Sequence, residues 1–224
     1  METIRTKKAI QVLFRRCGFE LRRYRRHIPH EERSITLGQL ASLDFGEITM
    51  EEARFLGDLV RRAPMEGPII EIGTLFGWST RIITMAKPVE QPLITVDNCI
   101  WNPWGLSPEE HRWLTEKLLA DAVKQFHVTQ RVMDKDRFFN QYDGLVPSLV
   151  FMDADHSYEG TRRDLEFARR VKTSVICGHD YDKTKWPGVV KAVDEFGGPK
   201  ELVGSLWVLE KECGVPRGDI QANT

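Results

Sequence analysis

Ionisable side chains gather in two short stretches of the sequence, and their types suit acid–base or metal chemistry. Residues 153–156 read Asp-Ala-Asp-His, and residues 179–181 read His-Asp-Tyr. Each stretch directly follows an apolar run of strand length, residues 149–152 and 174–177. Because neighbouring parallel strands end at the same edge of a sheet, we expect Asp153 and Asp180 to lie side by side there.

Two converging carboxylates need a cation, a shared proton or a basic partner, and the sequence leaves these alternatives open. Carboxylate oxygens favour Mg²⁺ or Ca²⁺, whereas ligation by His179 would favour Mn²⁺, Fe²⁺ or Zn²⁺. Without an ion, His156 or His179 could act as a base alone. The aspartates could instead only cap the helices that follow them, but the density of ionisable groups favours a functional cluster.

A glycine turn upstream could place a ligand beside these residues. The segment PIIEIGTLFGWST, residues 68–80, predicts a strand, a turn and the start of a helix. Gly73 permits a sharp turn, Gly77 permits a close approach to a bulky group, and the helix N-terminus presents backbone N–H groups to a ligand. Leu75 replaces the middle glycine of a dinucleotide fingerprint, and no Gly-Lys-Ser/Thr follows, which excludes a P-loop.

Acidic residues also follow the second and third predicted strands. Asp97 follows residues 92–96, about 24 residues after the first glycine of the turn, where an acid can accept both ribose hydroxyls of a nucleoside. Residues 128–132 predict a third strand, and Asp134 or Asp136 beyond it could reach an adenine amino group. The loop containing Trp101 and Trp104 either lines a pocket or packs locally.

Further elements are predicted by capping signals and by apolar spacing. Capping boxes at Thr49–Glu52 and Ser107–Glu110 predict helices that end near Arg62 and Phe126. Apolar spacing predicts two more helices after the ionisable stretches, and residues 206–209 predict a closing strand.

The segments DADHSYEGTRRDL, CGHDY and PGVVKAVDEF, in order after the glycine turn and Asp97, resemble a known family. They look like the small class I S-adenosylmethionine (SAM)-dependent methyltransferases grouped with sugar and macrolide O-methyltransferases, over about residues 48–209. The resemblance implies a single doubly wound, mostly parallel seven-stranded Rossmann-like α/β sheet with an N-terminal helical extension. It implies SAM as cofactor and O-methylation of a sugar or small-molecule hydroxyl, with assistance from Mg²⁺ or another divalent ion.

The resemblance also assigns roles to single residues. Metal-dependent relatives hold Mg²⁺ at positions that match Asp153, His179 and Asp180. The general base of sugar-modifying relatives matches Asp155. The expected catalytic set is Asp155, His156 and His179. The expected cofactor contacts are Glu71, Gly73, Thr74, Gly77, Ser79, Thr80, Asp97, Asn98, Asp134 and Asp153.

The composition limits the partners that we expect. A formal net charge of -1 gives no electrostatic case for nucleic acid. No apolar run is long enough for stable membrane insertion, and the first residues lack the apolar core of a signal peptide. Four scattered cysteines without a CxxC pair are typical of reduced thiols, so we expect a cytoplasmic protein.

Three regions are expected along the chain: a basic helical extension (1–47), a methyltransferase domain (48–212) and a C-terminal tail (213–224). The basic helix either packs on the domain or on a partner subunit of a homo-oligomer, or contacts a membrane surface or RNA; we favour packing. Alternative functions are a non-catalytic SAM-binding or scaffold protein, a metal hydrolase, a nucleic-acid N-methyltransferase, or a metal-independent methyltransferase with a histidine base.

Overall fold

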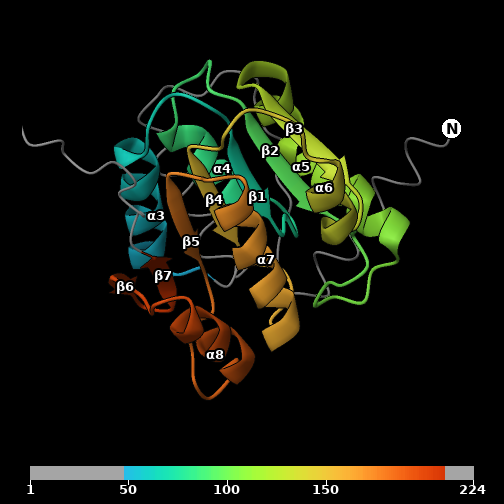
Figure 1. Cartoon of the computed structure of the whole chain (residues 1–224). Coiled ribbons are helices and arrows are strands. Elements are labelled where there is room, and N and C mark those ends of the chain that lie inside the picture. Colours follow the sequence, from blue (N-terminus) through green and yellow to red (C-terminus); the bar gives the residue numbers. More distant parts are fainter. Residues whose placement is uncertain (1–47, 210–224) are drawn as a thin grey trace, which may run out of the picture. The chain divides into compact units, whose positions relative to one another are not determined.

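A seven-stranded sheet with the strand order β3-β2-β1-β4-β5-β7-β6 lies at the centre of the structure, a computed structural model that describes residues 48–209 (Figure 1). All neighbouring strands are parallel except β7, which is antiparallel to both β5 and β6. The strands are β1 (Ile69–Ile72), β2 (Leu93–Asp97), β3 (Val128–Val132), β4 (Leu149–Met152), β5 (Val175–Gly178), β6 (Glu201–Val203) and β7 (Leu206–Leu209). The predicted doubly wound fold is confirmed.

Six helices accompany the strands in the part of the chain that the structure describes. They are α3 (Met50–Arg62), α4 (Trp78–Ala86), α5 (Pro108–Gln125), α6 (Lys135–Gln141), α7 (Tyr158–Arg170) and α8 (Pro187–Glu195). None of these helices is long and apolar enough to span a bilayer. The predicted extension (1–47) and tail (213–224) lie outside the described residues.

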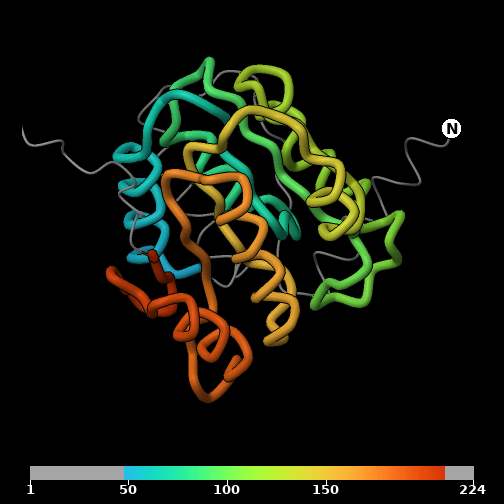
Figure 2. Tube along the Cα trace, viewed as in Figure 1, coloured from blue at the N-terminus to red at the C-terminus, as the bar shows by residue number. Residues whose placement is uncertain are grey.

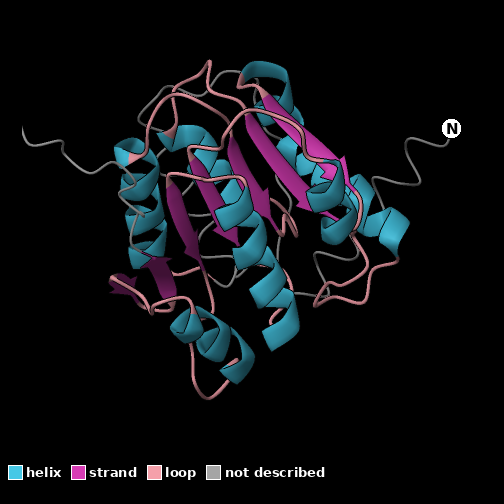
Figure 3. Cartoon of the chain, in the orientation of Figure 1, coloured by secondary structure: helices cyan, strands magenta, loops and turns pink. Residues whose placement is uncertain are grey.

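The central strands are apolar on both faces because helices cover both faces of the sheet. Side chains alternate along a strand, so Ile69 and Ile70 enter different cores. Helices α3, α4 and α5 pack on the Ile69 face, and α6, α7 and α8 pack on the Ile70 face. Figure 3 shows α7 crossing one face of the sheet.

Both predicted capping boxes are present. The Thr49 hydroxyl accepts from the Glu52 backbone N–H while the Glu52 carboxylate accepts from the Thr49 N–H, and Ser107 and Glu110 repeat the pattern. These reciprocal bonds satisfy N–H groups that have no partner within the helix. The two helices therefore begin where the sequence predicts, and the first ends at Arg62 as expected.

Two elements were not predicted. Helix α6 has only seven residues and begins at the N-cap Asp134, where we had expected no helix. Strand β6 has only three residues, Glu201 to Val203, and none of them is buried. Both are too short for an apolar period to show in the sequence.

Figure 2 shows that β6 and β7, at the red end of the trace, lie beside the blue helix α3.

The turn after β1 is tied to the residue that follows β4. Gly73 has a φ of 97°, and a Cβ atom there would lie 1.9 Å from the carbonyl oxygen of Asp153. The Asp153 N–H in turn donates to the Ile72 carbonyl at 2.8 Å. Only glycine permits this combination of backbone angle and backbone contact.

Gly73→Ala is expected to lower the free energy of unfolding by about 3 kcal/mol or more, because the clash is with backbone that cannot rotate away. Gly105→Ala is the control, since Gly105 also has a positive φ but nothing lies within 4 Å of its added Cβ. The control should lose about 1 kcal/mol. Urea denaturation of both variants measures the difference, and equal losses would contradict the proposed contact.

Candidate functional site

A cavity of about 750 Å³ opens at the carboxyl ends of β1, β2, β4 and β5. This is the edge at which open α/β sheets bind ligands, and the volume suits a ligand of nucleoside size with an acceptor beside it. The residues that line it and were predicted to act there are Gly73, Thr74, Ser79, Asp97, Asn98, Asp134, Asp153, Asp155, His156 and Asp180. Glu71, Gly77, Thr80 and His179 do not line it.

Asp97 holds the glycine turn in place. Its Oδ2 accepts from the backbone N–H groups of Thr74 at 2.9 Å and Leu75 at 2.8 Å, and its Oδ1 accepts from Cys99 N–H at 2.7 Å. A carboxylate has about four acceptor positions, so about one remains. The predicted contact with both ribose hydroxyls needs two. The turn N–H groups of Thr74 and Leu75 therefore bond to this side chain, although we had expected them to be available to a ligand.

Three of the expected cofactor contacts are hydrogen-bonded to one another. Glu71 in β1 is fully buried, and the hydroxyls of Ser79 and Thr80 donate to its carboxylate. These bonds join β1 to the first turn of α4, and only Ser79 also reaches the cavity. The close approach at Gly77 is to Leu119 of α5, 2.6 Å from the position of an added Cβ.

Of the two aspartates after β3, Asp134 is the one that lines the cavity. Its side chain also caps α6 by accepting from the Arg137 N–H at 2.9 Å. Asp136 pairs with Arg163 at 2.8 Å and is not part of the lining. Between them, Lys135 lines the cavity and pairs with the buried Asp164 at 2.5 Å.

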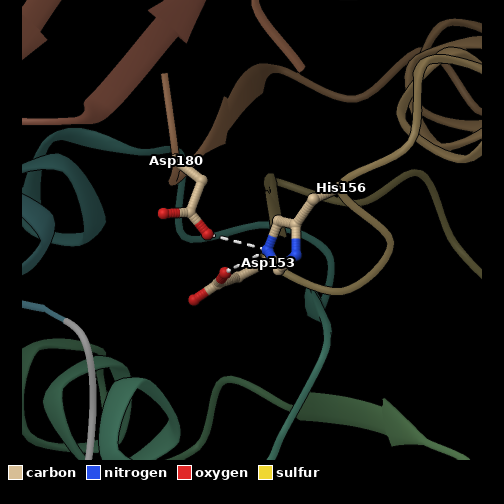
Figure 4. A group of neighbouring side chains, drawn as sticks. All are labelled: Asp153, His156 and Asp180. Atoms are coloured by element: carbon tan, nitrogen blue, oxygen red, sulfur yellow. Dashed lines mark ion pairs between the residues drawn. The ribbon is translucent and has the colours of Figure 1, made fainter. Parts of the chain in front are cut away.

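Asp153, His156 and Asp180 lie together (Figure 4), and all three line the cavity. His156 Nε2 lies 2.7 Å from Asp180 Oδ2 and 3.5 Å from Asp153 Oδ1. The Trp186 ring packs against the imidazole with the ring centroids 4.2 Å apart. The two aspartates that follow β4 and β5 thus lie together, as their strand positions predicted, with a basic partner between them.

The charges in this cluster support one another. Burial opposes the proton on His156, but Asp153 and Asp180 outweigh it and raise the pKa of the imidazole to about 10. Burial likewise opposes the charge on Asp180, yet His156 and His179 hold the pKa of its carboxyl far below its usual range. His156 is therefore a cation at neutral pH in this arrangement, and it is not a free base.

His179 lies beside the cluster, with its Nδ1 4.0 Å from Asp153 Oδ1. Its Nδ1 lies 3.4 Å from Asp180 Oδ1, and its Nε2 lies 2.9 Å from Ser205 Oγ. The potential ligand atoms that lie within 4.8 Å of one another belong to Asp153, His156 and Asp180. The geometry therefore favours His156 over His179 as the third potential ligand, and the set Asp153–His179–Asp180 stays a prediction.

Asp155 lines the cavity, and its carboxylate also accepts a hydrogen bond at the start of α7. Its carboxylate accepts from the Ser157 N–H at 3.0 Å and contacts Gly160. Burial would raise the pKa of Asp155, but the bonds with Ser157 and the nearby Lys135 lower it. Part of the acceptor capacity of this carboxylate is thus used within the protein, and the role of Asp155 as general base stays a prediction.

Sequence reasoning missed residues that support the cluster. Glu52 appeared only as half of a capping box, and Ser205 carried no motif. The buried position of Glu52 has no signal in its local sequence, since the exposed Glu110 occupies the same kind of box.

A seven-stranded sheet of this order, with an acid-rich cavity beside a glycine turn, defines the class I methyltransferase fold. A family model described as "Methyltransferase domain" matches residues 70–181, half of the chain. The chain belongs to this methyltransferase family. A search of curated proteins finds no match.

Solved structures share the fold. An O-methyltransferase from Bacillus cereus in complex with SAH is 20% identical, with 76% of this chain and 79% of that chain covered and a TM-score of 0.54. TomG, an O-methyltransferase from Streptomyces achromogenes involved in tomaymycin synthesis, in complex with SAM, is 18% identical, with 77% of each chain covered and a TM-score of 0.50. The cofactor-bound Rv0187 from MTB is 19% identical, with 76% and 78% covered and a TM-score of 0.55.

Glu71 should make stability depend on pH. Burial raises the pKa of its carboxyl to about 7, although Ser79 and Thr80 oppose the shift. Between about pH 4.5 and 7 the folded state then binds the proton and the unfolded state does not, so the free energy of unfolding falls as pH rises, by up to about 3 kcal/mol.

Glu71→Gln should remove this part of the pH slope, because glutamine does not titrate. Denaturation at pH 5, 6, 7 and 8 measures the slope, and the exposed Glu66→Gln serves as the control that keeps the wild-type slope. Identical slopes for the Glu71 variant and the wild-type protein would contradict the assignment.

Proposed function

We propose that the protein transfers a methyl group from SAM to a hydroxyl oxygen of a sugar or another small natural product. The observation that carries this proposal is the continuity of one cavity from the glycine turn to the Asp153–His156–Asp180 cluster. Methyl transfer needs the donor and the acceptor held in line in a water-poor pocket. Two of the structural relatives named above are O-methyltransferases, which supports oxygen as the acceptor atom.

The cofactor would lie along the wall formed by β1 and β2. When bound, SAM supplies an electrophilic methyl group on a sulfonium. Gly73 and Ser79 line the cavity at the turn, where we place the methionyl part. The remaining acceptor position of Asp97 would take one ribose hydroxyl and the neighbouring Asn98 the other. Asp134 would take the adenine amino group, since Asp136 is directed to Arg163.

The acceptor would lie against the ionisable cluster. Two carboxylates and an imidazole fit Mn²⁺, Fe²⁺ or Zn²⁺ by ligand type, and Mg²⁺ if the carboxylates dominate. A bound ion would lower the pKa of the acceptor hydroxyl. Asp153, with a side-chain exposure of 23% against 8% for Asp180, faces the acceptor more openly. Trp186, and on the exposed side of the cavity Trp101, would help exclude water from the reacting atoms.

Metal-independent transfer is the second candidate, and the His156–Asp180 ion pair favours it. His156 already supplies the positive charge that two carboxylates require. Asp153 would then be the proton acceptor for the hydroxyl. Any divalent ion must displace the proton of His156 before that residue can ligate it.

Asp153→Asn should reduce methyl transfer by at least about 100-fold, because both candidate mechanisms need its charge. Transfer from methyl-labelled SAM is measured with a panel of sugar, phenol and polyketide alcohol acceptors, and S-adenosylhomocysteine affinity is measured by calorimetry. The affinity should change less than about threefold. Asp121→Asn, on the exposed side of α5, is the control that keeps full activity. Full activity of the Asp153 variant would exclude the catalytic assignment.

Removal of divalent ions separates the two candidates. With EDTA, transfer should be lost and then restored by Mg²⁺ or Mn²⁺, while S-adenosylhomocysteine affinity stays constant. Mn²⁺ binding at pH 7 should also release about one proton from His156, which calorimetry in two buffers of different ionisation enthalpy detects. Unchanged transfer in EDTA would replace the first candidate with the second.

A further inference from the structure

The Glu52 carboxylate is buried and held at both oxygens, although it belongs to a helix N-terminus. Its side chain is 3% exposed. Oε2 accepts from the backbone N–H and the hydroxyl of Thr49 at 2.7 and 2.8 Å. Oε1 accepts from the backbone N–H and the hydroxyl of Ser205 at 2.6 and 3.0 Å. A capping box accounts for the bond from the Thr49 backbone N–H but not for the two bonds from Ser205.

The turn between β6 and β7 closes over this carboxylate. Gly204 there has a φ of 60°, and a Cβ atom at that position would lie 2.3 Å from Glu52 Oε1. Burial opposes the charge on Glu52, but hydrogen bonds from Ser205 and Thr49 outweigh it and lower the pKa of the carboxyl. A fixed negative charge is therefore enclosed between α3 and the last two strands.

Glu52 is the outer member of a row of alternating charges that ends in the cavity. Its Oε1 lies 3.4 Å from His179 Nε2. His179 Nδ1 lies 3.4 Å from Asp180 Oδ1, and Asp180 Oδ2 lies 2.7 Å from His156 Nε2. The Trp207 indole N–H donates to the His179 carbonyl at 2.9 Å and so fixes the backbone at this point.

We propose that Glu52 is a positioning residue for Asp180, acting through His179. Glu52 and Ser205 hold one edge of the His179 ring, and the other edge lies at ion-pair distance from Asp180 Oδ1; this attraction favours the orientation in which Oδ2 points toward His156 and the cavity. Without this contact the Asp180 carboxylate would rotate more freely, because the χ2 torsion of an aspartate has only broad energy minima. This inference rests on the proposed function of the cluster, because it assigns Glu52 to the same site.

The second capping box provides a matched control. Glu110 occupies the same position relative to Ser107, also accepts the N-cap N–H, and is exposed with no link to the cavity. Glu52→Gln and Glu110→Gln therefore make the same chemical change in the same local motif. An effect of helix capping alone should appear equally in both variants.

The first measurement is the ¹⁵N spectrum of the histidine rings at one fixed pH, with His179 assigned by its loss in His179→Asn and His156 by its loss in His156→Asn. Glu52→Gln should shift the ring signals of His179 and His156, and Glu110→Gln should shift neither. Unshifted His179 signals in Glu52→Gln, or equal shifts in both variants, would overturn the proposal.

The second measurement is the affinity for Mn²⁺, a probe that reports on Asp180 as a ligand. Glu52→Gln should weaken Mn²⁺ binding about tenfold, with S-adenosylhomocysteine affinity unchanged. The double variant Glu52→Gln/His179→Asn should bind Mn²⁺ no more weakly than Glu52→Gln alone, because both changes break the same chain of contacts. Losses that multiply would mean that Glu52 does not act through His179.

The outcomes separate this inference from the proposed function. If the wild-type protein binds no Mn²⁺, the divalent-ion candidate fails, and the histidine ring signals alone decide the role of Glu52. If Glu52→Gln does not fold, Ser205→Ala replaces it, since it removes the hydroxyl between Glu52 and His179 and leaves the capping box intact. Ser205→Ala should then shift the same ring signals, and their constancy would overturn the proposal.

Discussion

The contact between the glycine turn and the backbone of Asp153 is the constraint on which the rest of the site depends. It joins the end of β1 to the end of β4 without any intervening side chain, so the distance between them cannot vary through rotamer changes. A surface that would hold a methyl donor and a carboxylate that would act on the acceptor are thus parts of one rigid edge. Preorganisation of this kind lowers the cost of bringing the two reactants into line.

The charged side chains at this edge of the sheet are paired with side chains of opposite charge. Asp180 and His156 are partly removed from water, where an unpaired charge is costly and a paired one is strong. Each group stabilises the charged form of its neighbour, from the buried Glu52 in the first turn of α3 to His156 in the cavity. The site therefore carries fixed charges before any ligand arrives, and a divalent ion would have to compete with a proton for His156.

The sequence predicted those helices and strands whose bounds are specified by residues close together in the chain. Strands β3, β4 and β7 have the predicted bounds, β2 and β5 lie within one residue of them, and the capping boxes at Thr49 and Ser107 are present. It also brought Asp153 and Asp180 together, because strand neighbours follow from the fold class. It placed His179 in the metal set, whereas the geometry favours His156, because side-chain directions after a strand end are not specified by the sequence pattern. It also could not show that Glu71 bonds to Ser79 and Thr80, since a buried acid and a ligand-binding acid look alike in sequence.

The position of β7 has a consequence for the order in which the protein can mature. This strand inserts between β5 and β6 as the last one in the described sequence, and the residue before it, Ser205, contacts both Glu52 and His179. A nascent chain that has left the ribosome only as far as α8 already contains Asp153 and Asp180. It still lacks β7 and the contacts that Ser205 makes with Glu52 and His179. Such contacts between residues distant in sequence form late in folding. The contacts of Ser205 with Glu52 and His179 would therefore form only after β7 has been synthesised and has paired with β5.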